Sequence, residues 1–334
     1  MTKTAKTGLT VILSIFLAFL LIWWAMRGIN LDETWASIRK ANFWWILASF
    51  SLGVIAYVIR SERWKLLLEP MGHQVSSRHA LYSICMNYFW NLIIPRSGEV
   101  ARCTTLYTLD KTPVDQSFGT VISERVIDFL CLMFIAFLGV IFNFDLLLEL
   151  MNEVLAIRAT EVEKSSYSGL FILAGILGVI FLGILLFWKR IKKLAIFPRI
   201  KQFIFGLRQG LKSIFQLRKR GLFIVYTILL WVFYYLMTYL VVFSLPETSH
   251  LTLADGLYLL LVGGIGMIIP ASGGIGAFHS AMRLGFIVLG LSGEIGVIFG
   301  FLVHTPHMLI ALLLGGISLV MISLEKASLK KKTS

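Results

Sequence analysis

A short apolar string that contains a proline and a glycine occurs twice in this chain of 334 residues. Ile93–Gly98 reads Ile-Ile-Pro-Arg-Ser-Gly, and Ile268–Gly273 reads Ile-Ile-Pro-Ala-Ser-Gly. Proline ends a helix because it lacks an amide donor, and glycine tolerates a positive φ. In lipid, the backbone groups that such a break frees must be buried in protein or face a wet cavity. Each copy follows an apolar run too short to cross a bilayer, so we expect two re-entrant helical hairpins that meet near the middle of a membrane.

The composition supports a membrane setting for these two breaks. The chain is 57% hydrophobic and only 15% charged, whereas soluble domains are nearer half apolar and a quarter charged. We therefore predict an all-α, polytopic membrane bundle that forms a single integral membrane domain over residues 1–334. The alternative is that the two strings are unrelated loops at helix ends, because short apolar matches arise easily in such a chain.

Hydropathy predicts about six membrane spans in addition to the two hairpins. The hairpins are expected over 80–106 and 256–291, and the last span is expected to break near Pro306. The expected spans cover 9–26, 43–59, 116–142, 169–188, 222–243 and 295–324.

The order of these segments suggests a duplication. A span, a hairpin and a span make up residues 43–142, and the same order recurs over 222–324 with the hairpin expected from the opposite side. This is the pattern of an inverted-topology repeat, a plan common among secondary transporters. Segments 9–26 and 169–188 fall outside the repeat.

The net charge of +13 predicts an orientation, because lysine and arginine collect on the cytoplasmic side of membranes. The densest basic stretch is 189–220, Arg60 and Arg63 end the second predicted span, and lysines end the chain, whereas 143–168 leans acidic. We therefore expect an inner-membrane protein with both termini in the cytoplasm. Nucleic acid is a poor partner for this chain, since its basic residues are divided among short loops.

Charged residues at membrane depth cost at least about 2.5–3.5 kcal/mol each at a helix centre, so they need an explanation. Such residues cluster in the first hairpin and on the span after it, and pairs three residues apart share a helix face. One interpretation is a set of neutralised pairs, Glu99 with Arg102 and Arg125 with Asp128, that lock hairpin to span. The residues concerned are Arg96, Glu99, Arg102, Glu124, Arg125 and Asp128.

The other interpretation of this cluster is an anion site. Three arginines exceed what Glu99 alone would neutralise, arginine binds phosphate through two nitrogens, and a helix that starts at Ser97 points amide donors at the same place. A lipid phosphate would then be held by the arginines, with Glu124 and Asp128 as structural partners. The candidate substrate-binding residues are Asn91, Arg96, Glu99, Arg102 and Arg125.

Three histidines also fall within apolar segments. His279, His304 and His307 have no acidic or cysteine partners nearby in the sequence, which argues against a metal site. They are either hydrogen-bonded structural residues or, for His304 and His307, a proton relay.

Catalytic and cofactor motifs are not evident in the sequence. The three cysteines have no metal-type spacing, and the glycine-rich strings near 263–276 lack the strand and acidic residue of a dinucleotide site. We expect no catalytic residue, metal or cofactor. The residues expected to shape the gate between the hairpins are Pro95, Gly98, Pro270, Gly273, Gly274, Gly276 and His279.

The same residues carry a resemblance to a known family. The pattern Asn91-x-x-x-Pro95-x-x-Gly98-Glu99-x-x-Arg102, followed by Glu124-Arg125-x-x-Asp128 and by Pro270-x-x-Gly-Gly-Ile-Gly276, resembles the lysylphosphatidylglycerol synthase transmembrane-region family. The resemblance covers nearly the whole chain and implies a flippase-like membrane domain.

Some members of that family carry a cytosolic aminoacyl transferase that makes lysyl-lipid, and we do not expect that half here. The family often has an acidic residue where His279 stands, which implies that this chain handles something other than a cationic headgroup.

Three functions follow from these observations. The chain is expected to move a phosphate-bearing amphiphilic lipid between leaflets, with membrane lipids of anionic headgroup as its partners. An intramembrane lipid-modifying enzyme with Glu99 or Glu124 as general base is the second. A regulatory partner of a lipid synthase or glycosyltransferase is the third.

Overall fold

The computed structural model describes residues 39–142, 205, 208 and 212–333, and every regular element in these residues is a helix. The predicted spans 9–26 and 169–188, the acid-leaning loop 143–168 and most of the basic stretch lie outside the described residues. Four helices are long and four are short. The long helices are α3 (Phe43–Leu68), α6 (Val114–Phe142), α11 (Arg220–Val242) and α14 (Gly293–Thr333). The short helices are α4 (Ser77–Ile93), α5 (Gly98–Asp110), α12 (Leu253–Gly266) and α13 (Ala277–Val288), with 3₁₀ turns η1 (Glu69–Met71) and η2 (Ser272–Gly274).

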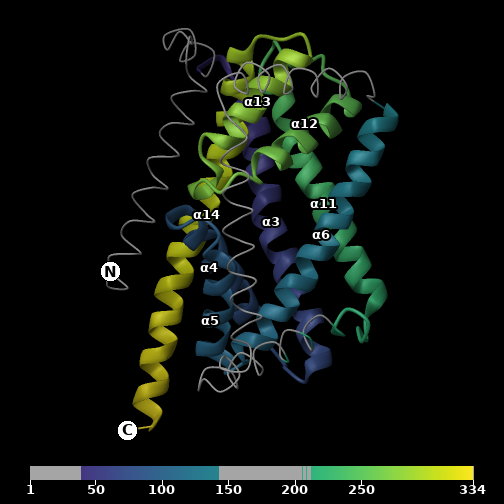
Figure 1. Cartoon of the computed structure of the whole chain (residues 1–334). Coiled ribbons are helices and arrows are strands. Elements are labelled where there is room, and N and C mark those ends of the chain that lie inside the picture. The colour runs from purple at the N-terminus through teal and green to yellow at the C-terminus, as the bar shows by residue number, and fades with distance from the viewer. Residues whose placement is uncertain (1–38, 143–204, 206–207, 209–211, 334) are drawn as a thin grey trace, which may run out of the picture.

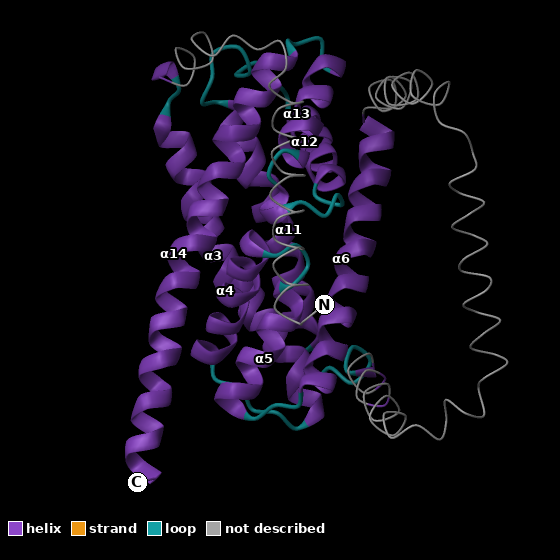
Figure 2. Cartoon of the chain, turned by 60° about the vertical axis from the view of Figure 1, so that its left-hand side comes forward, coloured by secondary structure: helices purple, strands orange, loops and turns teal. Residues whose placement is uncertain are grey.

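The short helices form two hairpins that enter the bundle from opposite ends. Figure 1 shows α4 and α5 in the lower half of the bundle and α12 and α13 in the upper half, between long helices that run most of its height. Figure 2 shows the loops at the tips of the hairpins at mid-height. In both halves of the described chain a long helix precedes the hairpin and another follows it. This element order agrees with the predicted organisation, while the inverted repeat itself stays a prediction.

Three of the described helices are long and apolar enough to cross a membrane, namely the segments Phe43–Met71, Arg220–Val242 and Gly293–Ala327. Each hairpin helix has 17 residues or fewer, below the roughly 20 that a crossing needs. The chain is therefore a multi-pass helical membrane protein, and the total number of spans stays a prediction.

The break in the first hairpin follows from Pro95. A proline disfavours helical backbone in the residue before it, and Ile94 is extended, with φ −127° and ψ 117°. The Ser97 hydroxyl donates to the Ile94 carbonyl at 2.7 Å, while the Asn91 Oδ1 accepts from the Gly98 amide at 2.8 Å. Each helix of the pair therefore supplies a polar group to the open end of the other, which satisfies backbone groups at the turn.

The second tip depends on glycine. Gly273, Gly274 and Gly276 have φ of 60°, 76° and 81°, which side-chain-bearing residues rarely adopt. They carry the chain from Pro270 through η2 into α13 within a few residues.

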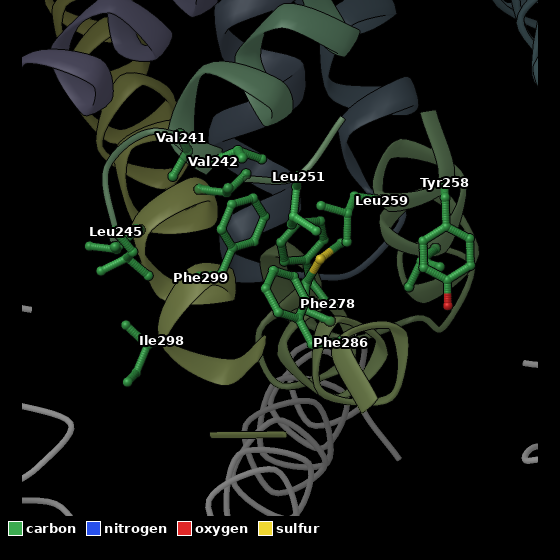
Figure 3. Packing of buried hydrophobic residues seen from close by; sticks show 14 of the residues in the cluster. Val241, Val242, Leu245, Leu251, Tyr258, Leu259, Phe278, Phe286, Ile298 and Phe299 are labelled. Atoms are coloured by element: carbon green, nitrogen blue, oxygen red, sulfur yellow. The ribbon is translucent and has the colours of Figure 1, made fainter. Parts of the chain in front are cut away.

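Each hairpin has its own apolar core. One cluster joins α12 and α13 to the ends of α11 and α14, and Figure 3 shows its aromatic and branched side chains packed together, including Phe278, Phe286 and Phe299. A second cluster joins α4 and α5 to α3 and α6 around Trp64 and Leu67. α3, α11 and α14 each contribute to both clusters, so these three helices fix one hairpin relative to the other.

Two sequence predictions differ from the structure. α14 continues through Pro306 without ending, since a proline inside a helix removes one hydrogen bond and need only kink it. The second predicted span ends at residue 59, but α3 extends to Leu68, so that Arg60 and Arg63 are buried. Their assignment as surface markers of the cytoplasmic side was therefore wrong.

A histidine joins three helix ends at the base of the first hairpin. His79, near the start of α4, contacts Asp110 of α5 at 2.7 Å and Glu325 of α14 at 2.9 Å. Partial burial lowers the pKa of His79, but its hydrogen bonds to these two carboxylates outweigh burial, so its pKa is raised above the usual 6.5.

The raised pKa of His79 gives a pH dependence with a definite sign. The protonated imidazole is favoured in the folded state, so its stabilisation is complete below about pH 6.5 and is lost as pH rises through the folded pKa. We predict that the gap in thermal midpoint between the wild type and His79→Gln narrows as pH rises from about 6 to about 8. A gap that widens over this range would contradict the assignment.

Gly98 tests the packing of the first hairpin. A Cβ at this position would collide with the Asn87 carbonyl and lie 2.6 Å from Asn91 Nδ2. We expect Gly98→Ala to lower the free energy of unfolding by about 1–3 kcal/mol, as overpacking does. Gly316→Ala is the matched control, because nothing lies within 4 Å of a Cβ there; it should be neutral or stabilising by up to about 1 kcal/mol. Chemical unfolding in detergent micelles would measure both.

Candidate functional site

The tips of the two hairpins meet inside the bundle. Arg96, at the first tip, donates from Nη2 to the carbonyl of Ile268 at the second tip, at 2.8 Å. A Cβ built on Gly273 would lie 2.8 Å from the Leu92 side chain. Arg96 has φ +61°, an uncommon value for a residue with a side chain.

A cavity of about 630 Å³ lies where the tips meet. Its walls come from both tips and from the middle parts of α3, α6, α11 and α14. One set of lining side chains is apolar, including Phe129, Leu132 and Leu259. The polar and charged lining residues are Tyr57, Arg60, Asn87, Tyr88, Asn91, Arg96, Glu99, Arg125, Asp128, Trp231, Tyr234, Thr238, His304 and His307.

A buried carboxylate stands at the centre of an ion-pair network beside this cavity. Glu124 of α6 is fully buried and contacts Arg60 at 2.6 Å, Arg63 at 3.3 Å and Arg102 at 3.0 Å. Arg60 and Arg63 belong to α3, and Arg102 belongs to α5. One carboxylate therefore holds the first hairpin, α3 and α6 together.

Asp128, one helical turn after Glu124, extends the network. Both of its oxygens accept from Arg63, at 2.8 and 3.2 Å. Arg60 also donates to the hydroxyls of Tyr88 on α4 and Tyr234 on α11, at 2.6 and 3.0 Å. Since buried charge must be paired and hydrogen-bonded, these contacts explain why the three arginines can be buried.

The predicted pairings were wrong, although the predicted residues do come together. Glu99 contacts Arg125 at 3.5 Å, Arg102 contacts Glu124, and Asp128 contacts Arg63. Removal of Arg102 would therefore strand Glu124, not Glu99. Asn91 lines the cavity and its Oδ1 accepts from the Gly98 amide, and its role in headgroup binding stays a prediction. The sequence analysis paired charged residues that are neighbours on one helix face. In the structure each charged residue pairs with a residue on a facing helix.

Positive charge is in excess in this part of the molecule. Five arginines (Arg60, Arg63, Arg96, Arg102 and Arg125) accompany three carboxylates (Glu99, Glu124 and Asp128). Among the described residues Arg96 has no carboxylate within ion-pair distance, and the Arg125 side chain is 43% exposed.

Arg102 is fully buried behind the wall, with its guanidinium over the Trp64 ring at 4.6 Å, so it does not line the cavity.

The three predicted histidines lie together on the side of the second hairpin. His279 and His304 have ring centroids 5.4 Å apart, and Phe278 stacks on His304 at 5.1 Å. The His279 Nδ1 accepts from the Gly276 amide at 3.3 Å. His304 and His307 line the cavity, whereas His279 does not. Within the described residues no cluster of histidine, cysteine and carboxylate side chains could hold a metal ion.

The geometry defines a class of protein: a helical membrane protein with two opposed hairpins and a charged cavity between their tips. Residues 11–315 match the family described as "Lysylphosphatidylglycerol synthase TM region". The chain belongs to this family, as the sequence resemblance predicted.

Two relatives extend the comparison. A UPF0104 membrane protein of Methanocaldococcus jannaschii is 26% identical over 344 residues, which cover 97% of this chain and 98% of the relative. A UPF0104 membrane protein of Methanothermobacter thermautotrophicus is 24% identical over 279 residues, which cover 78% of this chain and 80% of the relative. No solved structure matches the chain.

Sequence reasoning missed Arg60 and Arg63 as members of the site. Both follow an apolar run, so they were taken for a positive membrane border. The missed signal is that apolar residues continue after them, with Trp64 and three leucines at positions 66–68. A helix that resumes its apolar character after two arginines is expected to bury them.

Carboxylate-to-amide substitutions test the network. Glu124→Gln leaves three guanidinium groups around a neutral amide and should cost about 3–5 kcal/mol of unfolding free energy. Glu99→Gln is the matched change at the partly exposed pair of Glu99 and Arg125 and should cost at most about 1 kcal/mol. Chemical unfolding in micelles would rank them, and equal losses would contradict the central place of Glu124.

Proposed function

We propose that this protein moves a phosphate-bearing amphiphilic lipid between the leaflets of a membrane. The observation that carries the proposal is the cavity where the two hairpin tips meet, which combines excess arginine with a large apolar wall. Such a cavity matches both parts of an amphiphile: the arginines suit a phosphate, and the apolar wall suits an acyl chain. Membership in the family is consistent with a lipid-related role.

Three arginines are placed to meet the phosphate. Arg96 and Arg125 line the cavity with exposed side chains, and Arg60 lies deeper in the same wall. Arg96 donates to a neutral carbonyl, and a phosphate would instead offer its guanidinium two charged oxygens, which arginine binds bidentately. Arg102 was predicted to bind the phosphate, but we now assign it a supporting role, because it pairs with Glu124 behind the cavity wall.

An apolar border gives the lipid chains a way out of the cavity. Phe129 of α6 and Ile268 and Ile269 at the second tip are exposed, and Phe129 and Ile269 also line the cavity. A headgroup could therefore sit among the arginines while its chains lie against α6.

The architecture also suggests how access would alternate. The hairpins enter from opposite ends, so movement of one tip away from the other would open the cavity to one side at a time, as in transporters built from opposed repeats. The predicted gate residues Pro95, Gly98, Pro270, Gly273 and Gly274 lie at or beside these tips. We place the protein in the cell inner membrane with both termini in the cytoplasm. The driving force would be a gradient of ion or lipid.

The competing functions are less favoured by the geometry. Glu124 is fully buried among three arginines, and Glu99 is paired with Arg125, so neither carboxylate is placed as a free general base. A regulatory partnership with a lipid synthase or glycosyltransferase would need a docking surface. An altered lipid mass after incubation would favour the enzyme, and co-purification of a synthase would favour the partnership.

Arg125 allows a direct test in proteoliposomes that carry a labelled anionic phospholipid. Arg125→Gln should lower the translocation rate about tenfold, because it removes one charge-assisted contact, with little loss of stability since the side chain is half exposed. Arg78→Gln, an exposed arginine outside the cavity, should leave the rate unchanged. A folded wild type that moves no anionic lipid, or equal rates in all three proteins, would refute the proposal.

A further inference from the structure

The cavity also contains polar groups that the proposed phosphate site does not use. Apart from Arg60, whose Nε belongs to the ion-pair network, four lining residues each present a buried side-chain atom with no hydrogen-bond partner in the described part of the chain. These atoms are Asn87 Oδ1, Trp231 Nε1, His304 Nδ1 and His307 Nε2. Asn87 is 1% exposed and His304 6%. Buried polar atoms are nearly always hydrogen-bonded in folded proteins, so four such atoms around one cavity point to a ligand.

The chemistry of the four groups identifies the kind of ligand. The indole N–H of Trp231 can only donate, the amide oxygen of Asn87 can only accept, and a neutral imidazole nitrogen does either, depending on its tautomer. A phosphate oxygen only accepts and an ammonium group only donates, so neither satisfies the whole set. A hydroxyl group both donates and accepts, so a ligand with several hydroxyl groups can match both kinds of atom in the set.

The charges around these groups give a second argument against a cationic ligand. Among the described residues, His79 near the start of α4 is the one histidine in an ion pair. His304 and His307 therefore lack a carboxylate partner. The two carboxylates that line the cavity, Glu99 and Asp128, are each paired with an arginine. An ammonium headgroup would have to displace an arginine from its partner, whereas a neutral headgroup would not.

The rings are also held in place before any ligand arrives. Phe278 stacks on His304 with ring planes 21° apart, and His279 packs against the same ring edge-on. Trp231 packs edge-on against Tyr234, whose hydroxyl accepts from Arg60. Fixed groups of this kind lose little freedom on binding, which favours selectivity.

We propose that Asn87, Trp231, His304 and His307 form a second subsite that binds the hydroxyl groups of a neutral, polyhydroxylated lipid headgroup. The inference deepens the proposed function and rests on its lipid-binding part. The arginines hold the phosphate of the lipid, and this subsite decides which headgroup is accepted. Hydroxylated headgroups are preferred over both aliphatic and ammonium headgroups.

The test compares two short-chain lipids that differ only in hydroxyl groups. Dioctanoyl phosphatidylglycerol and dioctanoyl phosphatidyl-n-propanol share one phosphodiester charge and a three-carbon headgroup, but only the first has two hydroxyls. Isothermal titration of the purified full chain in detergent should show about tenfold tighter binding of the hydroxylated lipid, as expected for two net hydrogen bonds. Dioctanoyl phosphatidylethanolamine should bind more weakly than phosphatidylglycerol.

Two variants each replace one subsite residue with an apolar residue of similar size. His304→Phe and Asn87→Leu should each reduce the affinity ratio to about threefold or less, while binding of the propanol lipid is retained. His250→Phe, at an exposed loop histidine outside the cavity, should leave the ratio unchanged. Equal affinities in the wild type, or the wild-type ratio in both subsite variants, would overturn the inference.

The outcomes for the two proposals differ. Selective binding of the hydroxylated lipid without any translocation in proteoliposomes would refute the transport function and leave the subsite standing. Translocation with equal affinities for the two lipids would refute the subsite alone. Absence of binding by every lipid to folded protein would refute both.

Discussion

The structure depends on one buried carboxylate. Glu124 joins two arginines of α3 and one of α5 to α6, and through Arg60 the network reaches tyrosines on α4 and α11. A lone charge at that depth would be expensive, and so would any of the three guanidinium groups without it. The network is thus less a source of net stability than a constraint, because only one arrangement of five helices satisfies all of its members.

That constraint positions the cavity. The first hairpin is held against α3 and α6 by an apolar core and by ion pairs, whereas the second is held against α11 and α14 by an apolar core. The tips touch through few polar contacts, among them the bond from Arg96 to the Ile268 carbonyl. We propose that this interface, which has a cavity beside it, can separate. Alternating access would use this property, and the same cavity would bring phosphate and headgroup ligands together.

Much of the fold was predictable because two kinds of signal are local. Apolar runs and the Pro-Gly breaks placed the hairpins, since Pro95 forces Ile94 out of the helix and Gly273 permits a positive φ. The site was predictable only in part. Arg96, Glu99, Arg125 and Asp128 were expected at the site and lie there, but their partners were not, because pairing is decided across helices. Arg60 and Arg63 were missed for the same reason: burial of a charge depends on a partner on another helix, which spacing along one helix does not reveal.

We expect the two tips to meet at the same depth inside the membrane. Nitroxide labels at Ile94 and Ile269, placed singly and as a pair in reconstituted protein, measure this by accessibility to oxygen and to a nickel chelate and by the distance between labels. Both labels should lie near the middle of a hydrocarbon core about 30 Å thick and close to each other. Labels at the two opposite headgroup regions, separated by the full thickness of the bilayer, would contradict it.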